Sequence, residues 1–361
     1  MGARSYKVET MKALLLSEYL KLEMTEVAVP VLAQDEVLLR VEACGICGSD
    51  VHGFDGSSGR RIPPIIMGHE AAGTIASVGS GVSGWSVGER VTFDSTLYCG
   101  ACSYCLRGEV NLCDNRQVFG VSCTDYRRNG AFAEYIAIPE RVLYRLPQGL
   151  SFAEAAMIEA VSVALHAVAV SEFKAGDTVL VLGAGMIGTL IVQALRVAGA
   201  SHIFVADPDA SRLPGAGSSG AHTLIHLEGA GHDAASAVLQ KYANGVDHVF
   251  EAVGIGSTVK TAVAAVRKGG TVTLVGNIAP QVELPLQAVV TRQIRLQGTA
   301  ASAGEYPRAI ELLASKQIDV SPLISAVEPL SKGADAFERL YRREPNLIKI
   351  ILTPDPLADH A

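Results

Sequence analysis

The stretch between residues 47 and 70 carries three side chains of the kinds that hold zinc in proteins. Cys47, His69 and Glu70 offer a thiol, an imidazole and a carboxylate, which are the usual protein ligands of this metal. Ser49 and His52 follow the thiol closely, so a hydroxyl and a second imidazole could carry a proton outward. A lone cysteine or histidine in an apolar β-rich region is more often a buried structural residue. The zinc hypothesis therefore depends on motifs elsewhere in the chain.

A second group of thiols gives the most specific signal in the sequence. Four cysteines lie within 15 residues, namely Cys99, Cys102, Cys105 and Cys113. Four thiolates suit a closed tetrahedral zinc site, which has no open position and so serves the structure and not catalysis. An iron–sulfur cluster uses overlapping spacings, and a nucleic-acid-binding zinc module is a further alternative. No basic run surrounds these cysteines, which argues against the module, and we favour structural zinc.

Composition and charge exclude several classes of protein. The 361 residues, of which 49% are hydrophobic, suffice for about two globular domains. The net charge of −7 leaves no basic surplus for binding a nucleic-acid backbone. The apolar run 152–170 contains Glu154, Glu159 and His166, which argues for a buried helix and against a membrane span. The start of the chain shows no secretory signal, so we expect a cytoplasmic protein.

The residues up to about 150 predict a small β-rich domain. Short runs of alternating character fill 12–42, glycines punctuate further short runs, and no helical period is visible. Met11 begins the first expected strand, and residues 1–10 are expected to be an extension. Ser151 and Glu154 then form a capping-box pattern, after which the chain reads as helix.

Beyond residue 177 the sequence alternates β-branched runs with helical stretches, which predicts a parallel sheet covered on both faces. The expected strands are 178–182, 203–206, 246–251, 271–275 and 294–297. Helices at 306–314 and 333–342 and a strand at 348–352 are expected to follow. We therefore predict one domain at 1–154, a second at 155–297, and a segment, 298–361, that returns to the first domain.

A glycine-rich turn follows the first strand of this sheet. It reads Gly183-Ala184-Gly185-Met186-Ile187-Gly188 and precedes a helical stretch, the context that identifies a dinucleotide-binding turn. The next strand ends at Asp207, whose carboxylate suits the adenosine ribose hydroxyls and repels a 2′-phosphate, so NAD is favoured over NADP. Arg212 is the residue that could tolerate that phosphate. Pro214 and the two glycines that follow it predict a short helix.

Together, these motifs resemble the zinc-containing medium-chain dehydrogenases over nearly all of residues 11–355, and the polyol dehydrogenases in particular. The resemblance implies an α/β protein that has a GroES-like β-rich catalytic domain and a Rossmann domain with a doubly wound parallel sheet. It also implies a structural zinc lobe at 95–116, a second, catalytic zinc, and NAD as the cofactor. A homodimer or homotetramer is expected on the same ground.

By this resemblance Cys47 and His69 are ligands of the catalytic zinc. Glu159, in the run Ile158-Glu159-Ala160-Val161-Ser162-Val163, takes the place of a third ligand. Glu70 is the alternative or exchanging carboxylate, and both possibilities stay open at this point.

The resemblance also assigns residues to the cofactor and the substrate. Val275, Gly276 and Thr299 are expected along the nicotinamide. The polyol dehydrogenases have an arginine at the position of Ala301 and a tyrosine at that of Gly53. Because both residues are missing here, the resemblance implies the hydride-transfer reaction but does not identify the sugar alcohol that is oxidised.

The expected reaction is the reversible, NAD-dependent oxidation of a secondary alcohol to a ketone. The proton would leave through Ser49, a ribose hydroxyl and His52, and a water held by Glu70 or Glu159 is the competing route. Threonine-dehydrogenase-like or simple alcohol dehydrogenase specificity is an alternative within the enzymes. A non-catalytic zinc protein that uses the dinucleotide as a redox signal is the alternative from another class. A small-molecule alcohol is the expected partner, with no nucleic acid and no membrane.

Overall fold

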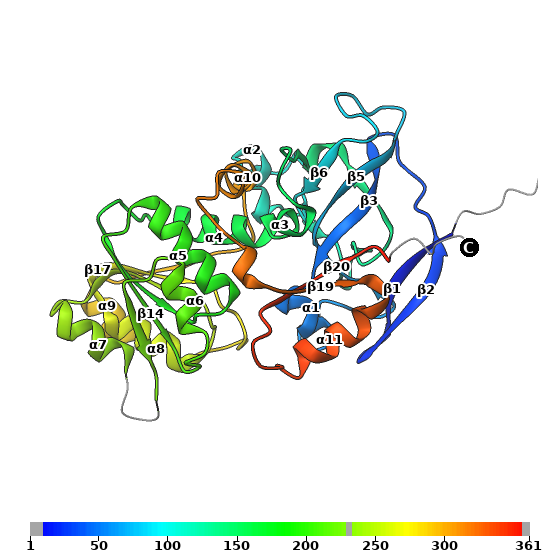
Figure 1. Ribbon diagram of the computed structural model, residues 1–361. Helices are drawn as coiled ribbons and strands as arrows, with labels where there is room; N and C mark the ends of the chain where they lie inside the picture. Colours follow the sequence, from blue (N-terminus) through cyan, green and yellow to red (C-terminus); the bar gives the residue numbers. More distant parts are fainter. Residues whose placement is uncertain (1–9, 229–232, 356–361) are drawn as a thin grey trace, which may run out of the picture. The chain divides into compact units, whose positions relative to one another are not determined.

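The computed structural model describes residues 10–228 and 233–355, and the chain divides into two units (Figure 1). The first unit combines Met1–Glu159 with Leu323–Ala361, and the second is Ala160–Pro322. Residues 1–9 of the expected N-terminal extension lie outside the described residues. The second unit keeps 298–322, which the sequence pattern assigns to the returning segment.

The reason for this second boundary is the packing of the residues that follow the parallel sheet. Gln193, in the helix after the glycine-rich turn, bonds the backbone of Asp319 in both directions, at 2.9 and 2.8 Å. These two hydrogen bonds hold the chain against the second unit until just before Leu323, where the chain returns to the first unit.

The first unit is built on a seven-stranded sheet whose order is β12-β6-β5-β3-β20-β19, with β11 also paired to β3. Its strands are β3 (Glu36–Gly45), β5 (Glu70–Val78), β6 (Arg90–Phe93), β11 (Tyr135–Pro139), β12 (Leu143–Arg145), β19 (Ile324–Pro329) and β20 (Lys349–Thr353). The C-terminal strand β20 thus lies beside β3, as expected for a returning segment. Residues 324–329, for which the sequence pattern predicts no strand, form β19, whose Ile324 pairs with Lys349.

Smaller elements complete this unit. A three-stranded sheet has the order β2-β1-β4. Its strands and the remaining short elements are β1 (Thr10–Glu18), β2 (Lys21–Ala28), β4 (Ile65–Ile66), β7 (Thr96–Leu97), β8 (Gln117–Val118), β9 (Val121–Ser122), β10 (Arg127–Arg128), α1 (Gly48–Phe54), α2 (Ser103–Leu106), α3 (Phe152–Ala156) and α11 (Gly333–Tyr341). The expected capping box is present at the start of α3, where Ser151 accepts a hydrogen bond from the Glu154 amide.

The sequence pattern gives no sign of helix α1, because seven residues that include two glycines show no helical period. Helix α1 is stabilised by hydrogen bonds at its N-terminus and by packing against α11. The Cys47 sulfur and the Asp50 carboxylate form a reciprocal cap at its N-terminus, and Phe54 packs against Phe337 of α11 with ring centres 5.8 Å apart. The first turn of α1 therefore has a defined orientation.

The second unit is a six-stranded parallel sheet with the order β15-β14-β13-β16-β17-β18. Its strands are β13 (Thr178–Leu182), β14 (His202–Asp207), β15 (Thr223–His226), β16 (Val246–Glu251), β17 (Val266–Leu274) and β18 (Arg295–Gly298). The central strands are buried along nearly their whole length, which explains their apolar runs. The strand order reverses at β13, so the expected doubly wound α/β topology is confirmed.

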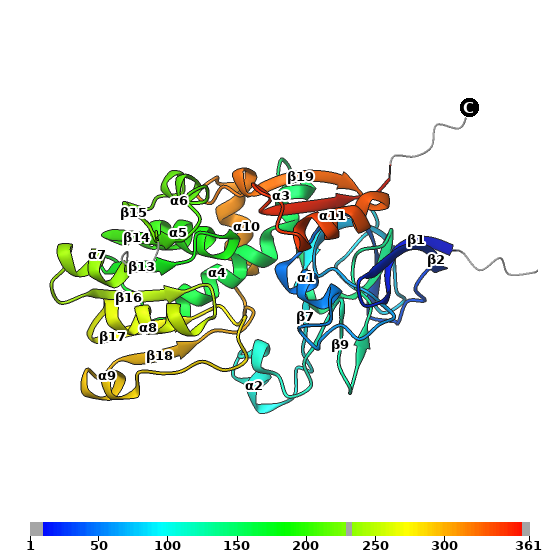
Figure 2. The same cartoon turned by 90° about the horizontal axis from the view of Figure 1, so that it is seen from below.

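Helices lie on both faces of this sheet (Figure 2). They are α4 (Ile158–Val170), α5 (Met186–Ala198), α6 (Leu213–Ser218), α7 (Ala234–Lys241), α8 (Gly256–Ala265), α9 (Leu286–Thr291) and α10 (Tyr306–Ala314). Helix α6 is short, as its proline and glycines predict. Within 10–228 and 233–355, no helix combines the length and the apolar character needed to cross a membrane.

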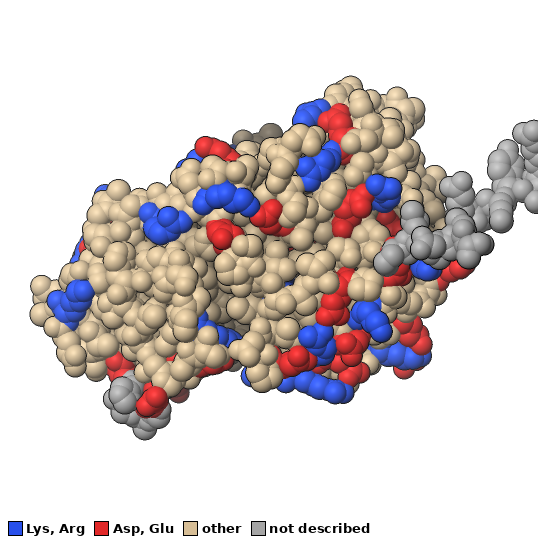
Figure 3. All heavy atoms as spheres, viewed as in Figure 1, with Lys and Arg blue, Asp and Glu red and all other residues tan. Residues whose placement is uncertain are grey.

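Basic and acidic side chains are interspersed on the face of the molecule shown in Figure 3. Neither sign forms a broad field there, consistent with the modest net charge of −7. This face offers none of the basic stripes that nucleic-acid-binding proteins use.

Candidate active site

The first unit brings the three candidate zinc ligands of the N-terminal stretch together. One ligand atom from each of Cys47, His69 and Glu70 lies within 4.8 Å of the others. Cys47 precedes α1 and Glu70 begins β5. Gly68 makes the turn between them possible, because it has a φ of +94° and a Cβ there would lie 2.9 Å from the Cys44 sulfur.

Glu70 is fully buried and shares its charge with a lysine that the sequence reasoning missed. Lys349 of β20 donates from Nζ to Glu70 Oε2 at 2.5 Å and to the Ile46 carbonyl at 3.0 Å. The two side chains meet across Gly45, where a Cβ would lie 2.5 Å from Glu70 Oε2. A lysine inside the apolar run Ile348-Lys349-Ile350-Ile351-Leu352 is the signal that could have revealed this ion pair, since an unpaired buried ammonium is costly.

The other oxygen of Glu70 is available to a metal. Oε1 is buried and has no hydrogen-bond partner among the described residues. A buried acceptor without a partner is unfavourable, and a cation held by this oxygen together with the Cys47 sulfur and the His69 ring would satisfy it. The donor set of sulfur, nitrogen and oxygen therefore fits zinc.

Asp50 contacts two of these candidate ligands, His69 and Cys47. Its Oδ1 lies 3.3 Å from His69 Nδ1, close enough for electrostatic attraction, but the two atoms are not aligned for a hydrogen bond. Its Oδ2 accepts a hydrogen bond from the Cys47 amide at 3.3 Å. Burial opposes ionisation of Asp50, but His69 and Arg61 outweigh it and lower the pKa of Asp50 to about 2. Because the carboxylate faces Nδ1, the other ring nitrogen of His69 is left for a metal.

The second candidate carboxylate, Glu159, does not belong to this group, in which the ligand atoms of Cys47, His69 and Glu70 lie within 4.8 Å of one another. It still interacts electrostatically with the site. Burial raises the pKa of Glu159 to about 7, with His69 acting against this rise and the charge of Glu70 adding to it. Glu159 is therefore a carboxyl group that can change protonation near neutral pH.

The two proton-relay candidates have separate surroundings. Ser49 accepts a hydrogen bond from Arg61 Nη2 at 3.0 Å, and its amide donates to the Cys47 sulfur at 3.5 Å. His52 is exposed, and its Nδ1 lies 3.4 Å from the Ser57 hydroxyl. The described residues contain no direct hydrogen bond between Ser49 and His52, so a relay between them needs an additional group.

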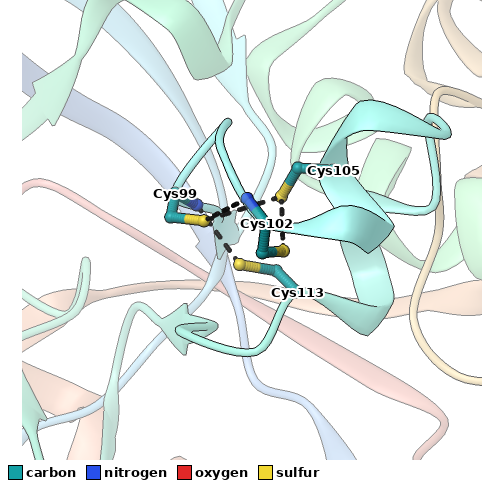
Figure 4. Close-up of side chains that lie close together, drawn as sticks. All are labelled: Cys99, Cys102, Cys105 and Cys113. Carbon is teal, nitrogen blue, oxygen red and sulfur yellow. Dashed lines mark hydrogen bonds between the residues drawn. The ribbon is translucent and has the colours of Figure 1, made fainter.

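The four-cysteine lobe brings its sulfurs together around α2 (Figure 4). The Cys105 sulfur lies 3.9 Å from that of Cys99 and 3.5 Å from that of Cys102, close to the roughly 3.8 Å expected between the sulfurs of a tetrahedral zinc site. Amide hydrogen bonds from Ala101 and Cys102 lower the pKa of Cys99 to about 6, which favours the thiolate form that binds metals. The lobe fits a structural zinc.

In the second unit the glycine-rich turn connects β13 to α5. Gly183 has a φ of +100°, and a Cβ on Gly188 would lie 1.9 Å from the Gly183 carbonyl oxygen, so both positions require glycine. Gly185 caps α5, which begins with Met186 and Ile187. The amide groups at this helix N-terminus suit a pyrophosphate.

Asp207 and Arg212 lie close to this turn. Asp207 accepts hydrogen bonds from the Ala184 amide at 2.7 Å and from the Asp209 amide at 2.8 Å, so its carboxylate is held at the carboxyl end of β14. Arg212 approaches Gly185 and pairs with Asp209 at 3.2 Å. Both residues that the sequence connects with the adenosine ribose are thus at the turn.

The three candidate nicotinamide residues follow the carboxyl ends of β17 and β18. The amides of Val275 and Gly276 both donate to the Glu251 carbonyl at 2.9 Å, and the Thr299 amide donates to the Leu274 carbonyl at 3.2 Å. Parallel sheets bind ligands at this edge. The Thr299 hydroxyl is buried and has no hydrogen-bond partner within the part of the chain that the structure describes, so it is free to bond a ligand.

Comparisons with known proteins agree with this architecture. Residues 33–148 match the alcohol dehydrogenase GroES-like domain, and residues 187–315 match the zinc-binding dehydrogenase domain. The chain is 34% identical to sorbitol dehydrogenase of Bacillus subtilis, over 96% of this chain and 98% of that protein.

Two solved structures carry the nicotinamide cofactor. A zinc-binding dehydrogenase of Sinorhizobium meliloti, bound to NADP, has a TM-score of 0.86 and 31% identity over 96% of this chain and all of that chain. A protein described as a short chain alcohol dehydrogenase of Escherichia coli CFT073, in complex with NADH, has a TM-score of 0.88 and 29% identity over 95% of this chain and 99% of that chain.

The chain therefore belongs to the zinc-containing medium-chain dehydrogenases. Within that family it is an alcohol dehydrogenase similar to the polyol dehydrogenases, and its cofactor class is NAD(P). The family and the fold class expected from the motifs are confirmed.

Proposed function

We propose that this protein catalyses the reversible, NAD-dependent oxidation of a secondary alcohol of a polyol to the ketone. The observation that carries the proposal is the group of half-buried Cys47 and buried His69 and Glu70, in which one Glu70 oxygen has no hydrogen-bond partner among the described residues. When bound there, zinc supplies Lewis-acid activation of the substrate hydroxyl, and NAD accepts the hydride.

We assign the metal-holding role to Cys47, His69 and Glu70, and not to Glu159. The separation of Glu159 from the other three supports this assignment. Asp50 faces His69 and orients it, and Lys349 occupies one oxygen of Glu70, whose other oxygen has no partner among the described residues. The four cysteines of the lobe hold the second zinc, which gives two ions per chain.

For the proton we propose Ser49 as the first group, because it lies beside the Cys47 sulfur. Ser49 would pass the proton on to a ribose hydroxyl of bound NAD, and the exposed His52 would release it to solvent. Glu159 is the competing acceptor, since its pKa of about 7 allows it to take up a proton at neutral pH.

For the cofactor we propose NAD. Asp207 would accept the ribose hydroxyls, the turn 183–188 would bind the pyrophosphate, and Val275, Gly276 and Thr299 would line the nicotinamide. The carboxylate of Asp207, held by two amides, supports discrimination against a 2′-phosphate.

We further propose a cytoplasmic homo-oligomer that associates through the β18 edge of the parallel sheet. Before β18 lies an exposed apolar segment, 278–290, in which five side chains are 40 to 68% exposed: Ile278, Val282, Leu284, Leu286 and Val290. Neighbouring exposed apolar side chains of this kind suit a protein interface.

The test is turnover of the purified protein with known metal content. NADH absorbance is followed with sorbitol, threonine and ethanol as substrates. Oxidation of sorbitol by a protein with two zinc ions per chain supports the proposal. Preference for threonine or ethanol would replace the polyol assignment, and zinc confined to the four-cysteine lobe with no turnover would favour a non-catalytic role.

A further inference from the structure

Glu251 is a buried carboxylate at the carboxyl end of β16 whose side chain has no part in the sites described above. Its Oε1 accepts hydrogen bonds from the Val253 amide at 3.0 Å, the Gly254 amide at 2.8 Å and the Thr258 hydroxyl at 2.7 Å. Its Oε2 also accepts from the Gly254 amide, at 3.0 Å. The carboxylate therefore holds both the turn after this strand, residues 252–254 (the β16 turn), and the start of α8.

The β16 turn packs directly on the turn that follows β17, residues 275–279 (the β17 turn). Gly254 has a φ of +87°, and a Cβ there would lie 2.3 Å from the Asn277 amide nitrogen. A Cβ on Gly276 would lie 2.2 Å from a carbonyl carbon of the β16 turn. The Gly254 carbonyl accepts a hydrogen bond from the Ala279 amide at 2.8 Å. Because the two backbones touch without side chains between them, a shift of the first turn moves the second.

The β17 turn carries Val275 and Gly276, two of the residues proposed to line the nicotinamide. Their amides both donate to the Glu251 carbonyl at 2.9 Å. The Glu251 carboxylate reaches the same turn by a second route, because Gly254 bonds it through its amide and bonds Ala279 through its carbonyl. The backbone and the side chain of one residue thus hold this turn at the ligand-binding edge of the sheet.

The glycine-rich turn 183–188 has separate support. Its first two amides donate to the Ala206 carbonyl at 2.8 Å and to the Asp207 carboxylate at 2.7 Å. Both acceptors belong to β14, so these hydrogen bonds do not depend on the carboxylate of Glu251. The adenosine and pyrophosphate part of the cofactor should therefore respond less to a change at Glu251 than the nicotinamide part.

We propose that Glu251 is a positioning residue for the nicotinamide end of the cofactor. Its carboxylate fixes the β16 turn, and through it the β17 turn, so that Val275 and Gly276 are in place before NAD binds. Carboxylates form stronger hydrogen bonds with amides than neutral acceptors do, and a loop that is ordered in advance costs less free energy on binding. This inference rests on the proposed function, because it concerns the cofactor site proposed there.

The experiment measures calorimetric binding of NADH and of ADP-ribose, which lacks the nicotinamide, to the purified protein. Glu251→Ala removes all the acceptor contacts of the carboxylate. We expect this variant to raise the Kd for NADH about tenfold or more and the Kd for ADP-ribose less than about threefold. Glu251→Gln retains one acceptor oxygen and should lie between the wild type and Glu251→Ala. If Glu251→Ala does not fold, Glu251→Gln decides by the same comparison.

Asp247→Ala is the matched control, at the opposite end of the same strand. Asp247 accepts hydrogen bonds from the Thr178 amide at 2.8 Å and the Thr178 hydroxyl at 2.7 Å, and it pairs with Arg267. Its loss should lower stability in urea, as the loss of Glu251 does, because both remove hydrogen bonds of β16. The ratio of the Kd for ADP-ribose to that for NADH should nevertheless stay unchanged in this control.

Equal weakening of NADH and ADP-ribose in the Glu251 variants, or no weakening of either, would mean that the carboxylate only stabilises the sheet, and would overturn the inference. A wild type that binds ADP-ribose as tightly as NADH would overturn it as well, since no nicotinamide contact would then need positioning. A wild type that binds neither ligand would refute the proposed cofactor site itself, and the inference with it.

Discussion

At the scale of single residues, the site consists of charges that compensate one another out of contact with water. Asp50 is shared by His69, Arg61 and the Cys47 amide. Glu70 pairs with Lys349 through one carboxylate oxygen, and its other oxygen has no hydrogen-bond partner within the described part of the chain. Such pairs cost desolvation energy and add little net stability, but removal of one partner leaves a buried charge uncompensated. We therefore expect substitution of the residues that contact the candidate ligands to disturb the site as well.

Lys349→Met tests this dependence. Without its partner, the buried carboxylate of Glu70 is uncompensated, and we expect a loss of about 3–5 kcal/mol in the free energy of unfolding, measured in urea on metal-free protein. The double variant Lys349→Met with Glu70→Gln should regain part of this loss. Lys260→Met breaks an exposed pair with Glu283 and should change stability far less. Equal effects of the two lysine variants would contradict the buried pair.

The expected preference for NAD over NADP depends on one residue, Asp207. Asp207→Ser removes the negative charge that opposes a 2′-phosphate, so the ratio of kcat/KM for NAD to that for NADP should fall by about tenfold or more. Steady-state kinetics with both cofactors measures it. Glu311→Gln changes an exposed carboxylate that pairs with Arg308, away from the glycine-rich turn, and serves as the control. An unaltered ratio in Asp207→Ser would exclude Asp207 as the discriminating residue.

At the scale of elements, strand and helix termini position the functional groups. The carboxyl ends of β13, β14, β17 and β18 carry the cofactor candidates, and the N-terminus of α1 carries Cys47. Polar side chains fix the segments that approach the sheet from its other end. His248 of β16 bonds Asp177 at 3.0 Å and packs on Phe173 with ring centres 5.7 Å apart, which holds the segment leading into β13.

His248 should make the stability of the protein depend on pH. Burial lowers the pKa of His248 below its usual value of about 6.5, although Asp177 acts in the opposite direction. The unfolded chain then binds a proton near pH 6.5 while the folded protein does not, so stability is complete above that pH and decreases as the pH falls below it. His248→Gln should be less stable at pH 8 and should lose less stability between pH 8 and pH 5.5. Urea unfolding at both pH values measures the difference, and identical decreases in the two proteins would refute this role.

At the scale of the whole molecule, the exposed apolar segment 278–290 and the β18 edge define the surface proposed for self-association. A stable interface buries about 1,200–2,000 Å² in total, which a sheet edge flanked by apolar side chains can provide. Leu286→Glu introduces a charge at a side chain that is 63% exposed, and we expect a shift from dimer or tetramer toward monomer in sizing with light scattering. Val87→Glu changes an equally exposed valine of the first unit and should leave the mass unchanged. A monomeric wild type would end this proposal.

The sequence by itself determined the features that depend on local spacing. The four cysteines, the glycine-rich turn and the apolar runs of the parallel sheet could all be recognised, because each needs only neighbouring residues to express its chemistry. Helix α1 and strands β15 and β19 could not be recognised, since they are short and their stability comes from tertiary contacts.

Only the tertiary structure decided how distant charges combine. Lys349 reaches Glu70 from 279 positions further along the chain, and Arg61 occupies the space that Gly53 leaves open. The apolar run around Lys349 marks a buried cation in the sequence, but its partner, and the place of Arg61, depend on side-chain packing between elements. The same packing distinguishes Glu70, which faces Cys47 and His69 closely, from Glu159, which does not. The sequence offers both carboxylates, and the backbone pairing of β3 with β5 and β20 is what brings an oxygen of Glu70 within 4.8 Å of ligand atoms of Cys47 and His69.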